Sequence, residues 1–133
     1  MTTTSIKYRL ARPGGEYNAL YAMMKRRMGE KQSLGWPTVV AEENGKQIGF
    51  LSTIPDESVV IAGPLVIDAE RRPFVFMRLV EAYENVLRAA GVTEYLFTVP
   101  ESQPEHLARV RAVVGEPLRV TSDGYAVFKR KIT

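Results

Sequence analysis

The side chains that most often carry chemistry are scarce in this 133-residue chain, which has no cysteine and only one histidine, His106. Thiolate nucleophiles, cysteine-ligated zinc and multi-histidine metal centres are therefore excluded. His106 follows Glu105 at the start of a short predicted helix. No nucleophile or orienting partner can be placed beside it, so we interpret it as an exposed or capping residue rather than a general base. Residue types alone assign no catalytic residue and no metal site.

Two adjacent arginines, Arg71 and Arg72, directly precede Pro73, a residue suited to the first position of a helix. The free backbone N–H groups and the dipole at a helix N-terminus favour anions. The pair therefore predicts a site for a phosphate or another anion, and a solvated pair of charges is the alternative that stays open. The other basic runs, at residues 25–27 and 129–131, are interpreted as solubilising charge.

Composition and charge narrow the class of protein. Hydrophobic residues make up 45% and charged residues 25% of the chain, as in ordinary soluble proteins, and the length suits one domain over residues 1–133. The net charge of +3 is too small to indicate a nucleic-acid partner when aromatic residues are not interleaved with the basic runs. No apolar stretch reaches membrane-spanning length and the N-terminus lacks a signal-peptide core. We therefore expect a cytoplasmic protein with no membrane partner.

Hydrophobic periodicity predicts alternating strands and helices. We expect strands at 5–12, 38–43, 46–54, 58–67, 93–99, 118–121 and 125–132, and helices at 16–28, 73–90 and 105–114. Asn44-Gly45 supplies the two positive-φ residues of a type I′ turn, which predicts a hairpin. Gly63-Pro64 interrupts the strand at 58–67. Because proline cannot donate to a sheet ladder, this strand should be bulged or lack a neighbour there.

The helix at 73–90 is the most strongly periodic element, with one apolar stripe that should face the core. Phe74 does not fall on that stripe. The stripe comprises Phe76, Leu79, Val80, Tyr83, Val86, Leu87 and Ala90, and the outer face comprises Arg78, Glu81, Glu84, Asn85 and Arg88.

The element order favours an α/β fold. The strand at 58–67, the helix at 73–90 and the strand at 93–99 are typical of a right-handed βαβ crossover, whereas most other strands are linked as hairpins. We predict a mixed, mostly antiparallel central sheet of about six or seven strands, with helices on both faces.

The segment from Leu65 to Arg88, LVIDAERRPFVFMRLVEAYENVLR, resembles the central block of the GNAT superfamily of acyl-CoA N-acyltransferases. In that block a strand ends in V-x-P-x-x-R-G-x-G-x-G and continues as a helix of the type A-L-L-E-A. Arg71 matches the family's arginine or glutamine, and residues 79–82 match the helix. The short helix ending at Val114-Gly115 resembles a later family segment, Y-x-x-x-G-F. The likeness runs over almost the whole chain. The segments GPLVID and RLVEAYE are also similar to small GNAT-like proteins of tailed phages.

This resemblance implies a GNAT-type N-acetyltransferase that moves an acyl group from acetyl-CoA to an amine acceptor. In the family, pantetheine pairs with the backbone of a splayed central strand, and the pyrophosphate lies on amides at the start of the following helix. A homodimer is left open. Carried over to this chain, the acetyl-CoA-binding residues are Leu65, Val66 and Ile67 on the strand and Arg71, Arg72, Phe74, Val75 and Phe76 at the helix start.

The chain departs from the family's cofactor loop. Arg72, Phe74 and Phe76 stand where the family has glycines, and Pro73 removes one backbone amide. Phe74 should stand near the phosphate cradle, where it could plug the site, join a subunit contact or pack under a loop. The alternative hypothesis is therefore a catalytically silent GNAT-fold binding or assembly module of a phage-related kind.

The chain also departs from the family's proton-transfer groups. Arg111 stands where the family often has a tyrosine that protonates the thiolate, and the strand at 58–67 contains no carboxylate or histidine. Proton transfer through water from Glu42 or Glu43 on a neighbouring strand is the remaining option. The catalytic residues stay unassigned.

Overall fold

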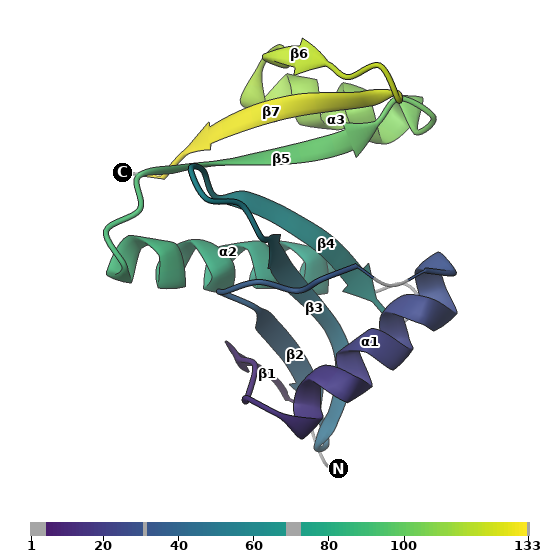
Figure 1. Ribbon diagram of the computed structural model, residues 1–133, viewed down its shortest axis with the longest axis vertical. Coiled ribbons are helices and arrows are strands. Elements are labelled where there is room, and N and C mark those ends of the chain that lie inside the picture. Colours follow the sequence, from purple (N-terminus) through teal and green to yellow (C-terminus); the bar gives the residue numbers. More distant parts are fainter. Residues whose placement is uncertain (1–4, 31, 69–72, 133) are drawn as a thin grey trace.

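The computed structural model describes residues 5–30, 32–68 and 73–132. These ranges contain seven strands and three helices, and Figure 1 shows how they are arranged. The elements in order are β1 (Ile6–Leu10), α1 (Gly15–Met28), β2 (Val39–Glu43), β3 (Lys46–Ile54), β4 (Ile61–Ile67), α2 (Pro73–Ala89), β5 (Glu94–Pro100), α3 (Pro104–Val114), β6 (Arg119–Val120) and β7 (Tyr125–Lys131).

The strands form one sheet in the order β1-β2-β3-β4-β5-β7-β6. Every neighbouring pair is antiparallel except β4 and β5, which run parallel on either side of the α2 crossover. The predicted α/β class and mostly antiparallel mixed sheet are therefore confirmed. No helix within the described ranges is long and apolar enough to cross a membrane.

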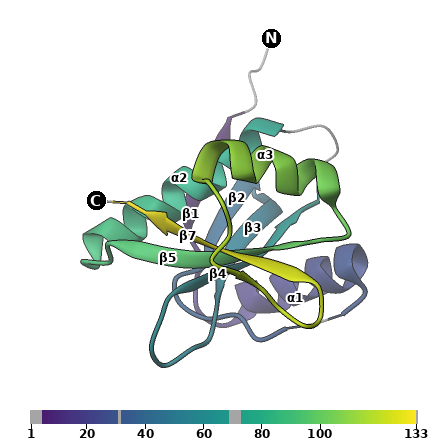
Figure 2. The same ribbon diagram turned by 90° about the horizontal axis from the view of Figure 1, so that it is seen from above.

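The helices cover both faces of this sheet, as Figure 2 shows. On one face, α1 packs its buried Leu20 and Met24 against Phe50 of β3 and Val66 of β4. On the opposite face, α2 covers β1, β2 and β3, and α3 covers β5 and β7. Phe97 of β5 packs against the clusters under both α2 and α3. Phe97 therefore connects the apolar clusters that lie beneath these two helices.

The local turn chemistry agrees with the sequence prediction for the β2–β3 hairpin. Asn44 and Gly45 have φ angles of 53° and 76°, the positive values that a type I′ turn requires.

β4 begins at Ile61 rather than at residue 58. The Asp56 carboxylate accepts hydrogen bonds from the backbone N–H groups of Ser58 and Val59, and this turn delays the strand.

The stripe predicted for α2 is wrong at its first turn. Val75, which was not assigned to the stripe, is fully buried together with Leu79 and Tyr83, whereas Phe76 is 37% exposed. Phe76, in the same turn as Val75, lies against His106 of α3 instead. The predicted outer face is also wrong at Glu84, which is only 4% exposed because β5 and β7 supply partners for it.

Candidate functional site

β4 and β5, the only parallel neighbours in the described part of the sheet, pair over a small part of their length. They pair only at Ile61 with Leu96 and at Ala62 with Phe97, and after these pairs they diverge toward their C-terminal ends (Figure 1). On its other side, β4 shifts register against β3 between the partners Leu51 and Thr53. The predicted bulge and loss of a neighbour at Gly63-Pro64 are thus both confirmed.

The β3–β4 register decides which backbone groups of β4 face the divergence. The Asp68 N–H donates to the Ile48 carbonyl at 2.7 Å, and hydrogen-bonded positions alternate along an antiparallel ladder. Val66, opposite Phe50, therefore bonds to β3. The N–H and C=O of Leu65 and Ile67 point away from β3, toward the side that β5 has left. Of the three strand residues expected to contact pantetheine, two present backbone groups there, while the Val66 side chain is buried against α1.

The end of β4 is fixed to α1 by charge. Arg26 Nη2 lies 2.6 Å from the Asp68 carboxylate and Arg27 Nε lies 3.8 Å from it. These two arginines, interpreted from the sequence as solubilising charge, therefore bind the residue that directly follows β4. The ion pairs hold the edge formed by Leu65 and Ile67 against α1 and β3, on one side of the divergence.

The residues predicted at the start of α2 take different positions. Arg71 and Arg72 lie outside the described residues. Phe74 is 54% exposed, and Val75 has no exposed surface because it is part of the core under α2. Phe76 meets His106 of α3 edge to face, with ring centroids 6.4 Å apart and an interplanar angle of 86°.

A chain of aromatic ring contacts runs from α2 through β5 to β7. Tyr83 of α2 and Tyr95 of β5 meet edge to face at 5.7 Å, Tyr95 lies 6.2 Å from Phe97, and Phe97 stacks on Phe128 of β7 at 5.4 Å. The Phe76–His106 contact joins the first turns of α2 and α3.

Neutral hydroxyl groups, rather than a base, lie beside the bulge of β4. Ser52 and Thr38 are within 2.6 Å of each other, and Thr53 is within 2.7 Å of the Tyr83 hydroxyl. Burial raises the pKa of Tyr83 to about 12, so this phenol stays protonated near neutral pH.

Glu42, one of the two carboxylates considered for proton transfer, and Arg111, which stands where the family often has a tyrosine, both have ionic partners. Glu42 accepts a hydrogen bond from Arg9 at 2.7 Å, and this bond lowers the pKa of Glu42. β3 lies between β2, which carries Glu42, and β4. Arg111 pairs with Glu116 at 3.4 Å. The geometry thus leaves the general acid and base unassigned.

A buried carboxylate that the sequence analysis missed connects α2 to the C-terminal strands. Glu84 accepts a 2.7 Å hydrogen bond from the Tyr95 hydroxyl and also pairs with Arg130 of β7. Arg88, one turn further along α2, lies 3.5 Å from Glu84 and donates to the Ile132 carbonyl at 2.7 Å. Burial, followed by the hydrogen bond to Glu84, raises the pKa of Tyr95. Only the i, i+4 spacing of Glu84 and Arg88 gives a sequence signal for this cluster.

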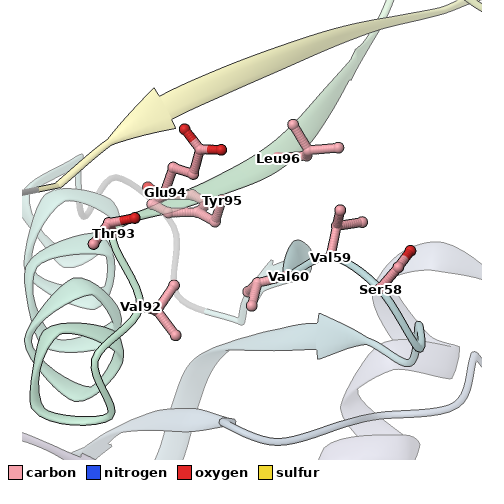
Figure 3. A pocket seen from close by; sticks show the side chains of 8 residues that line it. All are labelled: Ser58, Val59, Val60, Val92, Thr93, Glu94, Tyr95 and Leu96. Atoms are coloured by element: carbon pink, nitrogen blue, oxygen red, sulfur yellow. The ribbon is translucent and has the colours of Figure 1, made fainter.

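A separate pocket of about 260 Å³ lies on the other side of the β4–β5 contact. Figure 3 shows its lining side chains, which come from the segment before β4 and from the start of β5. They are Ser58, Val59, Val60, Val92, Thr93, Glu94, Tyr95 and Leu96. The paired residues Ile61 and Ala62 separate this pocket from the diverging ends of the strands, so it is distinct from the candidate acyl-donor site.

Comparisons with solved structures show the fold. The ribosomal-protein-S18-alanine N-acetyltransferase from Escherichia coli has a TM-score of 0.71 at 17% identity, covering 98% of this chain and 95% of that one. An N-acetyltransferase from Staphylococcus aureus Mu50 has a TM-score of 0.74 at 14% identity, covering 97% and 99%. A GNAT family N-acetyltransferase from Escherichia coli in complex with CoA has a TM-score of 0.72 at 16% identity, covering 100% and 84%. No family model and no curated protein sequence matches the chain. The fold is therefore that of the GNAT N-acetyltransferases.

Proposed function

We propose that this GNAT-fold chain is an N-acetyltransferase that transfers the acetyl group of acetyl-CoA to an amine. The observation that carries the proposal is the divergence of β4 from β5, which leaves the backbone N–H and C=O groups of Leu65 and Ile67 facing an open edge. The amides of a pantetheine arm can pair with such an edge as a further strand would. Solved structures with this fold include one in complex with CoA and one with acetyl-CoA, which supports the same donor here.

The reaction can proceed without a catalytic side chain if the protein positions the thioester for attack by the amine. The nitrogen of a neutral amine forms a bond to the thioester carbonyl carbon, the carbon–sulfur bond breaks, and the thiolate leaves and takes up a proton. The attacking nitrogen loses one proton to water. Because the hydroxyl groups beside the bulge are neutral, the chain contributes mainly by holding the thioester against β4, which converts a bimolecular encounter into an oriented one.

Amide exchange measured by NMR tests this binding mode residue by residue. Acetyl-CoA should slow exchange of the Leu65 and Ile67 N–H groups, because each gains an acceptor. The Val66 N–H, already bonded to β3, is the internal control and should change little. Calorimetric titration with acetyl-CoA supplies the affinity, and release of free thiol in the presence of primary amines measures transfer. Absence of both a binding heat and a change at Leu65 and Ile67 would refute the proposal.

A catalytically silent binding module is the second candidate. The hydrogen bond from Arg9 to Glu42 favours it, because this bond lowers the pKa of the carboxylate and so makes it a weaker base. This candidate predicts that no amine accelerates thiol release at saturating acetyl-CoA. The N-acetyltransferase predicts that at least one amine does.

A further inference from the structure

We propose that the pocket beside the start of β5 binds a small N-acylated amino acid derivative with an aliphatic side chain. The pocket has a volume of about 260 Å³ and lies between the segment before β4 and the first residues of β5 (Figure 3). It is smaller than pockets that hold drug-sized ligands, which limits the occupant to a small molecule. The transfer reaction proposed above would form N-acylated amines, but this inference stands on the pocket itself and does not depend on that reaction.

The backbone of Glu94 supplies polar groups to this pocket. The Leu96 N–H donates to the Val60 carbonyl at 2.8 Å. Because backbone groups alternate in direction along a strand, the N–H and C=O of Glu94, two residues earlier, point to the same side. The Thr93 carbonyl instead accepts from the Ile132 N–H at 2.9 Å, on the β7 side of β5. Glu94 therefore has one donor and one acceptor on the side of the pocket.

A turn before β4 leaves these two groups of Glu94 without a strand partner. In a continued parallel ladder they would bond to the segment at 58–60. The Asp56 carboxylate instead accepts from the N–H groups of Ser58 and Val59, at 2.9 and 3.0 Å, and β4 pairs with β5 only at two later positions. Within the described ranges, no hydrogen bond joins the backbone of Glu94 to the segment before β4.

A single extended amino-acid residue with an acylated nitrogen complements these groups. In an antiparallel hydrogen-bonded pair, two residues exchange both of their backbone hydrogen bonds. The N–H of the ligand would donate to the Glu94 carbonyl, and the carbonyl of the same ligand residue would accept from the Glu94 N–H. The pocket would thus recognise its ligand as the edge of a sheet recognises one residue of an added strand.

The side chains around the pocket favour a neutral ligand with an aliphatic group. The Glu94 carboxylate is 47% exposed and lies 3.7 Å from Lys129, so it already has an ionic partner. Val59 is 46% exposed, and covering such apolar surface with an aliphatic group is favourable. The aliphatic residues that line the pocket are Val59, Val60, Val92 and Leu96.

An NMR titration with N-acetylvaline methylamide, carried out without acetyl-CoA, tests the site. The amide signals of Glu94 and Val60 should shift, with a dissociation constant of about 10 mM or below for so small a ligand. The ester analogue, in which oxygen replaces the valine N–H, cannot donate to the Glu94 carbonyl. It should bind at least about threefold more weakly.

Two substitutions at Glu94 separate the contribution of its backbone from that of its side chain. Glu94→Pro removes the N–H on the pocket side and takes no bond from the β5–β7 ladder. Proline is tolerated there because Glu94 is the first residue of β5. This variant should bind the amide at least about threefold more weakly. The matched control Glu94→Ala keeps the N–H and removes only the exposed carboxylate, so its affinity should stay within about twofold of the wild type.

The other outcomes overturn the inference. They are the absence of a shift at Glu94 in the wild type, equal binding of the amide and its ester analogue, and loss of binding in Glu94→Ala. Binding of N-acetyl-trivaline methylamide about tenfold more tightly than the single residue would indicate a peptide partner instead of a small molecule. If Glu94→Pro does not fold, the amide and ester comparison still decides. Because the titration contains no acetyl-CoA, its failure leaves the proposed function standing, and failure of acetyl-CoA to bind leaves this result unchanged.

Discussion

Replacing Glu84 by alanine should be one of the most destabilising single changes in this protein. Its carboxylate is 4% exposed and accepts from the Tyr95 hydroxyl while pairing with Arg130. Leaving the buried Tyr95 donor without a partner costs about 1–3 kcal/mol. Arg130 is 39% exposed at its side chain, so losing that pair adds at most about 1 kcal/mol. The expected loss in the free energy of unfolding is about 3 kcal/mol.

Thermal and urea unfolding measure this loss. The entropy of unfolding near 60 °C is about 2.1 cal/mol/K per residue, so a loss of about 3 kcal/mol in this chain lowers Tm by about 10 °C. Tyr95→Phe should cost about 1 kcal/mol, because Glu84 keeps its arginine partners. The double variant Glu84→Ala, Tyr95→Phe should be more stable than the sum of the single losses predicts, since the orphaned hydroxyl is gone. Strict additivity, or a Tm change below about 3 °C for Glu84→Ala, would contradict this account.

The pH dependence of unfolding gives an independent check on Tyr95. Its folded-state pKa is raised, by burial first and by Glu84 second. A group with a raised pKa contributes stability below its unfolded pKa, about 10 for tyrosine, and that stability is lost as the pH rises further. Tyr95→Phe should therefore lose less stability than the wild type above about pH 10. Both proteins contain Tyr83, whose pKa is also raised, so both should lose some stability at alkaline pH.

Three further perturbations follow from the structure. The hydrogen bond from Arg9 is the main cause that lowers the pKa of Glu16 from the ordinary 4.5 to about 2. Since one pKa unit corresponds to about 1.4 kcal/mol, Glu16→Gln should cost up to about 3 kcal/mol at pH 7. In acid unfolding, this variant should lose less stability than the wild type as the pH falls from 4.5 toward 2. A Cβ at Gly35 would lie 2.7 Å from the Thr53 carbonyl oxygen, so Gly35→Ala should cost about 1–3 kcal/mol in urea unfolding, while Gly15→Ala, with nothing within 4 Å, should not destabilise the protein. If a neutral amine attacks without a protein base, the midpoint of the pH–rate profile should move with the pKa of the amine supplied; identical profiles for two amines of different pKa would instead indicate a titrating group of the protein.

Local sequence signals account for much of the sheet. Asn44-Gly45 specifies the β2–β3 hairpin because both residues tolerate positive φ. Gly63-Pro64 marks the bulge because proline lacks an N–H. The order of strands and helices then restricts the fold to a mixed sheet with one crossover. Each of these signals lies within a few residues of the feature that it predicts.

The candidate site depends on contacts that no local signal contains. Helical periodicity gives the side of α2 on which Phe76 lies, but it does not show that His106 of α3 is the neighbour of that ring. For the same reason Glu84 resembles a solvent-facing residue until β5 and β7 are placed beside it. The register against β3, a separate strand, determines that the backbone N–H and C=O of Val66 face β3 while those of Leu65 and Ile67 face away from it. Arg71 and Arg72, which the sequence predicts to bind an anion, lie outside the described residues.

The brief pairing of β4 with β5 makes the sheet mechanically uneven. The strands β1 to β4 pair with one another along most of their length, as do β5 and β7, but only two residue pairs of β-ladder join these groups within the described ranges. The ion pair between Glu84 of α2, which packs on β1 to β3, and Arg130 of β7 is a further link between the two groups. A thioester arm bound between the diverging ends of β4 and β5 would add hydrogen bonds where the two strands do not pair. The ligand would thus make the whole sheet more rigid although it contacts only the boundary between these strands.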